Sequence, residues 1–232
     1  MLELKNVASG YGTIQVLRGI SMEIKEGELV AVIGRNGVGK TTLMKTIMGV
    51  VRTMDGSILF NGKDYTKLRP HTRANDGIGY VEQGHGIFPD LTVEENLKMG
   101  LKINTAVKDK SLDIAYEYFP ILFERKRQKG GTLSGGQQAM LSIARVLVGQ
   151  PKLMILDEPS EGIQPNVVHQ IGEIIIKCNQ ELGLTTLMVE QHLRLIQQTA
   201  QRAYAIDKGI VVGQLTREDL MDNAVVNSYL TV

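Results

Sequence analysis

Cysteine is almost absent from this chain, and neither sign of charge predominates. Cys178 is the only cysteine among 232 residues, so no internal disulfide can form. This usage fits a reducing compartment such as the cytosol. Lysine and arginine number 26 against 25 aspartates and glutamates, which gives a net charge of +1. Proteins that bind nucleic acid usually carry a stronger basic bias, so we expect no nucleic-acid partner.

Long apolar runs are also missing. No run reaches the roughly 18 residues that a membrane-spanning helix needs. The first residues, Met1–Lys5, lack the apolar stretch and cleavage site of a secretory signal. If the protein works at a membrane, other chains must span it. Apolar residues still make up 43% of the chain, enough for one large domain or a core with an inserted lobe.

Short apolar runs alternate with helical patterns. Runs of four or five residues predict strands buried on both faces at Leu29–Ile33, Leu153–Leu156, Thr185–Val189 and Ala203–Ile206. Helices are expected at about 40–48 and along the apolar positions of 167–182. This alternation favours a mostly parallel α/β sheet. The opening of the chain reads as short strands with turns, and Asp55-Gly56 and Asn61-Gly62 flank Ser57–Phe60 with hairpin chemistry.

The composition shifts after Gln83. Between residues 84 and 150 the patterns are mostly helical, with helices expected at 91–101, 112–119 and 134–148. We therefore expect a core formed by residues 1–83 and 151–232. Residues 84–150 should interrupt it as a helical subdomain.

The segment Gly34–Thr41 reads GRNGVGKT and matches the pattern G-x-x-x-x-G-K-[ST]. Its glycines allow backbone N–H groups to turn toward phosphate oxygens, and the next helix directs its N-terminus at the same anion. A glycine turn before a helix is the plainer alternative, but the buried strand just before it favours a nucleotide site. The residues expected to bind ATP here are Gly34, Asn36, Gly37, Gly39, Lys40, Thr41 and Thr42. Lys40 would reach the β- and γ-phosphates, and Thr41 would ligate Mg²⁺.

Two carboxylates follow the apolar run Leu153–Leu156. Polar groups at the carboxyl end of a buried parallel strand lie where such sheets bind ligands. We expect Asp157 to hold Mg²⁺ and Glu158 to orient or deprotonate the attacking water. Adjacent strand residues point to opposite faces, so the two could take different roles. A strand that runs out into a solvated turn is the alternative reading.

The segment Leu133–Gln137, which reads LSGGQ, marks the start of a helix. Ser134 and Gln137 fit a capping box, and the two glycines leave backbone N–H groups open to an anion. By spacing alone, a capped helix with a flexible entry is the simpler reading.

Together these segments resemble the ATP-binding cassette (ABC) family of transporter ATPases over nearly the whole chain. The resemblance rests on Gly34–Thr41, Gln83, Leu133–Gln137, Leu156–Pro159 and their order. It implies an α/β fold with a mostly parallel P-loop NTPase core, an antiparallel β part and an inserted helical lobe. It also implies that Leu133–Gln137 is the family's signature motif, which closes over ATP bound to another subunit. The signature residues are Ser134, Gly135, Gly136 and Gln137.

The resemblance assigns further positions. Tyr11 stands where an aromatic ring stacks on adenine, although a lone tyrosine is more often ordinary packing. Gln83 stands where a glutamine senses Mg²⁺ and couples to the membrane partner, and Ser160–Pro165 corresponds to the loop that crosses to the partner subunit. Glu158 would then catalyse only in a dimer that holds two nucleotides between its subunits.

Three positions depart from the family pattern. The switch position, often histidine, is Gln191, and a shift of one residue would give that role to His192. Which of the two contacts the γ-phosphate stays open. Gln164 replaces an aspartate that is common in the crossing loop, and Glu82 replaces a proline before Gln83. None of these changes removes the catalytic carboxylate.

Within the family, the chain resembles the smaller ATPase subunits of branched-chain amino-acid importers and of their urea and short-amide relatives. The segment Phe88–Leu97 carries this resemblance. Two loops, Ser160–Pro165 with the sequence SEGIQP and Arg35–Lys40 with the sequence RNGVGK, look more like the urea branch. The resemblance implies a second, different ATPase subunit, two membrane permease subunits and an extracytoplasmic substrate-binding protein. It places the chain peripherally, at the cytoplasmic face of the inner membrane.

Two other functions remain as alternatives. The first is a soluble ABC ATPase that acts on nucleic acid or ribosomes, which usually needs coiled-coil insertions or two cassettes in one chain. The second is a non-catalytic nucleotide-binding regulator, against which Lys40, Asp157 and Glu158 argue.

Overall fold

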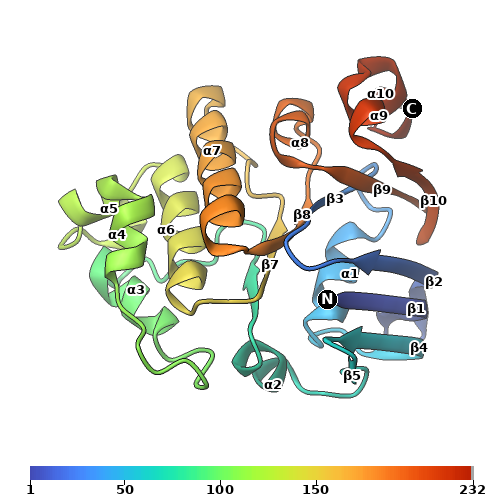
Figure 1. Cartoon of the computed structure of the whole chain (residues 1–232), viewed down its shortest axis with the longest axis horizontal. Helices are drawn as coiled ribbons and strands as arrows, with labels where there is room; N and C mark the ends of the chain where they lie inside the picture. The colour runs from blue at the N-terminus through green and yellow to red at the C-terminus, as the bar shows by residue number, and fades with distance from the viewer. Residues whose placement is uncertain (231–232) are drawn as a thin grey trace.

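Two β-sheets with different strand directions organise the chain (Figure 1). The computed structural model describes residues 1–230. The antiparallel sheet has the order β2-β1-β4-β5, with β1 at Leu2–Tyr11, β2 at Ile14–Ile24, β4 at Thr53–Phe60 and β5 at Lys63–Asp64. The second sheet has the order β10-β9-β3-β8-β7-β6. Its strands are β3 (Leu29–Ile33), β6 (Ile78–Val81), β7 (Leu153–Asp157), β8 (Thr185–Val189), β9 (Arg202–Asp207) and β10 (Ile210–Leu215).

The second sheet is parallel except at its edge, where β10 pairs with β9 in the antiparallel sense. Strands β3, β7 and β8 are buried along their whole length, which explains their continuous apolar sequences. All four predicted buried strands are present, and two of them have the predicted ends. The expected α/β architecture with an antiparallel part is therefore confirmed.

The helices fall into three groups in chain order (Figure 1). The first group is α1 (Lys40–Ile47) and α2 (Pro70–Asn75). The second comprises α3 (Val93–Gly100), α4 (Asp113–Tyr118), α5 (Pro120–Glu124), the 3₁₀ turn η1 (Gly130–Thr132), α6 (Gly135–Val148) and α7 (Pro165–Leu182). The third is α8 (Leu193–Thr199), α9 (Arg217–Met221) and α10 (Asn223–Leu230). No helix among residues 1–230 is long and apolar enough to cross a membrane.

Helix α1 is packed between the two sheets. Leu43, Met44 and Ile47 are fully buried and share one apolar cluster with residues of both sheets, such as Leu4 on β1 and Ile155 on β7. This packing fixes the direction of α1, and with it the position of the loop that precedes it.

Helix α6 joins the helical segment to the other face of the parallel sheet. Its residues Leu141 and Ala144 share a cluster with Leu97 of α3 and with Met154 and Leu156 of β7. A capping box between Ser134 and Gln137 starts the helix, as predicted.

Several sequence predictions were wrong or incomplete. The opening strands are long rather than short, because register shifts near Asn6, whose φ is +49°, interrupt the alternation of β1. Asp55-Gly56 lies inside β4 and makes no hairpin, whereas Asn61-Gly62 does turn β4 into β5. The elements that were not predicted are α2, β6, α5, η1, α8, β10, α9 and α10.

Arg73 of α2 explains how this short helix is held. The side chain is 1% exposed, and its guanidinium donates to the carbonyl oxygens of Leu68, Thr46, Ile47 and Thr66 at 3.0, 3.0, 2.6 and 3.2 Å. Burial lowers the pKa of Arg73 to about 10, which leaves it charged at neutral pH. Its positive charge lies at the C-terminal end of α1, where it interacts favourably with the helix dipole.

We expect Arg73→Ala to lower the free energy of unfolding by about 2–4 kcal/mol, because it leaves buried carbonyl groups without donors and opens a cavity. Urea denaturation measures the effect. The control is Arg69→Ala, an exposed arginine on the same segment, which should change stability by less than about 0.5 kcal/mol. Equal effects of the two substitutions would contradict this role.

Candidate active site

The loop between β3 and α1 has the backbone of a phosphate cradle. Gly34, Gly37 and Gly39 have φ values of +148°, +79° and +111°. A Cβ atom on Gly34 would lie 2.3 Å from the carbonyl oxygen of Ile206, so a side chain is excluded there. Gly39 provides no side-chain cap for α1, which leaves the first N–H groups of that helix available to an anion.

A cavity of about 400 Å³ opens at this loop. It is lined by Val16, Asn36, Gly37, Gly39, Lys40, Thr41, Thr42, Gln83 and Glu158. Lys40 is 4% exposed, and its ammonium group donates to the carbonyl oxygens of Gly34 and Arg35 at 2.8 and 2.7 Å. Burial lowers the pKa of Lys40, while the Glu158 carboxylate opposes that change. A phosphate group in the cavity would meet this charge directly.

Asp157 is held at the carboxyl end of β7 by two hydroxyl groups. Thr41 donates to one carboxylate oxygen at 3.1 Å and Tyr80 donates to the other at 3.0 Å. Burial raises the pKa of Asp157, and these two hydrogen bonds oppose the rise. An adjoining cavity of about 270 Å³ is lined by Thr41, Tyr80, Gln83 and Asp157 among others. Hydroxyl, amide and carboxylate oxygens suit Mg²⁺, so the residues predicted as metal ligands fit that ion.

Glu158 does not continue the strand. Strand β7 ends at Asp157, and Glu158 has a φ of +51°, which is unusual for a residue with a side chain. The expectation that strand alternation separates the two carboxylates was therefore wrong. The left-handed backbone turns Glu158 toward the phosphate cradle, where its carboxylate lies 3.7 Å from the Lys40 ammonium. Strained backbone of this kind is often kept where function needs it.

Two glutamines hold the Glu158 carboxylate. The amide of Gln83 donates to one oxygen at 3.1 Å, and the amide of Gln191 donates to the other at 2.6 Å. Gln191 also donates to the side-chain oxygen of Asn36 at 2.6 Å. The side chain of Gln191 thus lies between the phosphate loop and the candidate base.

His192 is placed differently. Its backbone N–H donates to the Glu190 carboxylate, and its ring Nδ1 is buried without a hydrogen-bond partner among residues 1–230. Of the two switch candidates, the structure brings only Gln191 into contact with Glu158.

Other predicted residues are not gathered at this cavity in the single chain. Tyr11 ends β1, is 50% exposed and does not line the cavity. Ser134 and Gly135 are exposed at the start of α6, and none of the signature residues lines the cavity.

Three residues of this site were not predicted from the sequence. Tyr80 went unrecognised because β6 was not predicted. Glu161 accepts a hydrogen bond from Gln83 at 3.0 Å, and Glu190 is buried beside Gln191. For Glu190, the only signal in the sequence was a carboxylate immediately before the switch position, Gln191.

Comparison with known proteins decides the family. A model of the family described as ABC transporter matches residues 17–161. The chain belongs to the ABC transporter family. This ABC chain is 42% identical to the high-affinity branched-chain amino acid transport ATP-binding protein BraG of Pseudomonas aeruginosa, over 99% of both chains. It is 36% identical to the probable branched-chain amino acid transport ATP-binding protein LivF of Archaeoglobus fulgidus, over 96% of this chain and 95% of that one.

Another relative of this ABC chain is named for a different transport process, and solved cassettes share its fold. The lipopolysaccharide export system ATP-binding protein LptB of Haemophilus influenzae is 35% identical over 99% of this chain and 97% of that one. Among solved structures, the ATP-binding cassette MJ1267 superimposes with a TM-score of 0.85 at 27% identity, over 100% of this chain and 99% of that one. A dimeric cassette, MJ0796, bound to ADP and Pi, has a TM-score of 0.83 at 26% identity, over 94% and 99% of the two chains. The protein is an ABC transporter ATPase that binds ATP.

We expect Gln191→Ala to lower ATP turnover by at least about tenfold, because Glu158 loses the amide that holds it beside the phosphate loop. Steady-state ATPase assays measure the effect. His192→Ala is the matched control and should change turnover by less than about twofold. A larger loss in His192→Ala than in Gln191→Ala would reverse the assignment of the switch residue.

Proposed function

We propose that this chain is the ATP-hydrolysing subunit of a multi-subunit importer of branched-chain amino acids. The observation that carries the proposal is the 42% identity, over 99% of both chains, to an ATP-binding protein named for high-affinity branched-chain amino acid transport. A second relative with the same named substrate supports it at 36% identity. Urea or short amides are the second candidate, favoured by the sequence SEGIQP of the crossing loop, Ser160–Pro165.

Each residue of the active site has one task in the proposed reaction. Lys40 and the N-terminus of α1 bind the phosphates, with Asn36, Gly37, Gly39 and Thr42 around them. Glu158 takes the proton of the attacking water, and Gln191 holds Glu158 in place. Thr41, Gln83 and Asp157 would hold Mg²⁺, which neutralises charge on the phosphates. Tyr80 keeps Asp157 oriented, since its hydroxyl occupies one carboxylate oxygen.

The site is completed by a second ATPase subunit, a different chain in this proposal. In the second subunit, the residues equivalent to Ser134–Gln137 would close over the nucleotide bound by this chain. Tyr11 of this chain would stack on the adenine of that nucleotide. The exposure of Ser134 and Gly135 at the capped N-terminus of α6 supports such an intermolecular role. A dimer has been observed for the MJ0796 cassette, which adds support.

An apolar groove of about 410 Å³ is the proposed contact with the membrane permease subunits. It lies between α2, β6 and the helical segment 84–150, and its exposed apolar side chains are Phe88, Met99 and Ile103. Arg145 ties the groove to the loop after Gln83, because it donates to Gly86 at 2.8 Å and lies 5.1 Å from the Phe88 ring.

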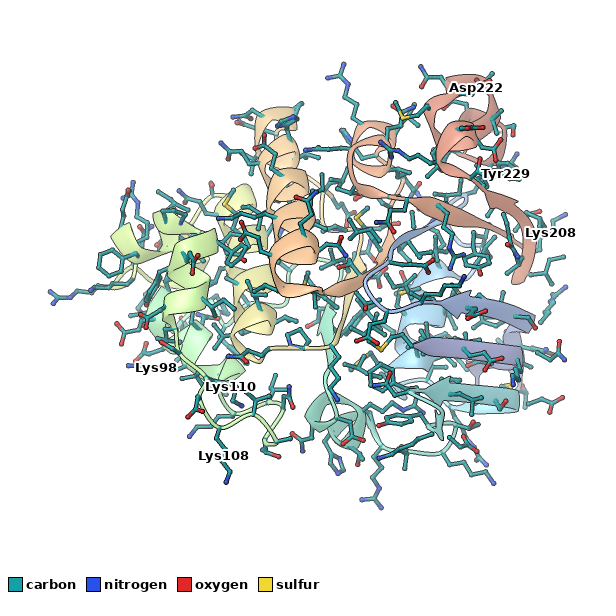
Figure 2. The ribbon with its side chains drawn as sticks, in the orientation of Figure 1. Lys98, Lys108, Lys110, Lys208, Asp222 and Tyr229 are labelled. Carbon is teal, nitrogen blue, oxygen red and sulfur yellow. The ribbon has the colours of Figure 1, made fainter. Side chains whose placement is uncertain are left out.

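The outer wall of this groove is preformed. Asn104 donates to the carbonyl oxygens of Gly149 and Gln150 at 3.1 and 2.8 Å, and Lys110 folds back to donate to Asn104 at 3.1 Å. Figure 2 shows Lys98, Lys108 and Lys110 together on α3 and the loop that follows it. A short amphipathic helix of a permease fits such a groove, with apolar side chains inside and an acidic one toward Lys102, which lines the groove. The subunit then lies peripherally at the cytoplasmic face of the inner membrane.

Transport assays test the substrate. Deletion of the gene should abolish uptake of labelled leucine at low concentration and leave urea uptake unchanged. The wild-type gene should restore leucine uptake, whereas Glu158→Gln should bind ATP and restore almost none, because the proton acceptor is gone. Loss of urea uptake alone would favour the second candidate. Full restoration by Glu158→Gln would contradict the assignment of the base.

The groove has a separate test. Met99→Glu places a charge among apolar contacts, so we expect it to reduce co-purification with the permease subunits by at least about tenfold without altering ATP binding by the isolated chain. Phe123→Glu is the control, because Phe123 is 52% exposed on α5 and does not line the groove. Equal loss in both variants would reject the groove as the docking site.

A further inference from the structure

Glu190 is a buried carboxylate beside the active site that the reaction described above does not use. It follows β8 directly and is 3% exposed. Glutamate is almost never buried so deeply unless other groups satisfy its charge. Burial raises the pKa of Glu190, and hydrogen bonds from its neighbours oppose the rise. Burying such a carboxylate costs free energy, so we ask which function its hydrogen bonds serve.

One oxygen of Glu190 holds the switch segment. Its Oε1 atom accepts the backbone N–H groups of Gln191 at 2.7 Å and of His192 at 2.8 Å. His192 is the N-cap residue of α8, and its own side chain makes no cap hydrogen bond. The Glu190 carboxylate therefore fixes the backbone from which the Gln191 side chain extends.

The other oxygen of Glu190 holds the crossing loop. Its Oε2 atom accepts the hydroxyl of Ser160, which is 7% exposed, at 2.7 Å. Ser160 lies two residues after Glu158, in the loop that leads into α7. One carboxylate thus joins the segment after β7 to the segment after β8.

We propose that Glu190 is a positioning residue that sets the Gln191 side chain against Glu158 and ties this arrangement to the crossing loop. The inference rests on the proposed role of Gln191. The amide of Gln191 reaches both Glu158 and Asn36 at 2.6 Å, and such short hydrogen bonds depend on a fixed backbone. A displacement of Ser160 by the partner subunit would be transmitted through Glu190 to Gln191 and hence to the base.

A purely structural role, as an anchor of the turn before α8, makes a different prediction. Such an anchor stabilises the fold whether or not Gln191 keeps its side chain. A positioning residue affects turnover only while the group that it positions is present. A double-mutant cycle separates the two roles.

The experiment compares ATP turnover of Glu190→Ala in the native chain and in a Gln191→Ala background. We expect Glu190→Ala to lower kcat about tenfold in the native chain and by less than about twofold in the Gln191→Ala background. The KM for ATP should change less than about threefold, because Lys40 and the glycine loop are untouched. Glu190→Gln keeps the Oε1 acceptor and can still hydrogen-bond Ser160, so it should recover most of the lost turnover.

Ser160→Ala covers the case in which Glu190→Ala does not fold. It cuts only the link to the crossing loop, so kcat should fall about threefold in the native chain and not at all in the Gln191→Ala background. Equal losses in both backgrounds would overturn the positioning role and leave the proposed function intact. If the single variant Gln191→Ala hydrolyses ATP as fast as the unchanged chain, the proposed role of Gln191 is rejected, and the inference with it. The substrate of transport affects none of these outcomes.

Discussion

The hydrogen bond from Thr41 to Asp157 joins the first turn of α1 to the carboxyl end of β7, and the geometry of the site depends on that junction. Helix α1 is fixed by packing between two sheets, and β7 is fixed between β6 and β8. Because β3, β6, β7 and β8 are parallel, the loops that follow them gather at one edge. The phosphate loop, Gln83, Glu158 and Gln191 each follow one of these strands.

Charge is the second constraint. Lys40, Asp157 and Glu190 are all at most 4% exposed. Burial lowers the pKa of Lys40 and raises the pKa of Asp157 and Glu190, so it favours the neutral form of each group. Backbone carbonyl oxygens accept from Lys40, and hydroxyl and backbone N–H groups donate to the two carboxylates, which offsets these costs without filling the cavity at the phosphate loop. The site therefore keeps a buried positive charge in reach of a nucleotide, and two buried carboxylates that local donors satisfy. Arg73 adds a fourth buried charge at the far end of α1, where the helix dipole favours it.

The sequence predicted the parts of this arrangement that local patterns encode. The buried strands Leu29–Ile33 and Thr185–Val189, and the capping box at Ser134, depend on neighbours in the chain, and all three were confirmed. What failed depends on contacts between distant segments. The six-residue helix α2 is held by the contacts of Arg73 with α1, and Glu158 departs from strand alternation through a backbone angle that no local pattern reveals.

The same limit explains why Gln191 and His192 could not be separated from the sequence. A shift of one residue after β8 moves a side chain across the site, and the Glu190 carboxylate, through Ser160 on another loop, decides the register. Family membership narrowed the choice to this pair, but only the arrangement of three loops in space placed Gln191 beside Glu158.

Two routes converge on the Glu158 carboxylate. One comes from the groove, through the loop after β6, to Gln83 on one oxygen. The other comes from the crossing loop, through Glu190, to Gln191 on the second oxygen. Each carboxylate oxygen has two lone pairs, so the proposed base can accept a proton from water while both amides hold it, and displacing either amide would change the direction of the carboxylate. In the proposed complex, partner contact at either end of the molecule would therefore act on the same carboxylate, and hydrolysis would respond to both the permease and the second ATPase subunit.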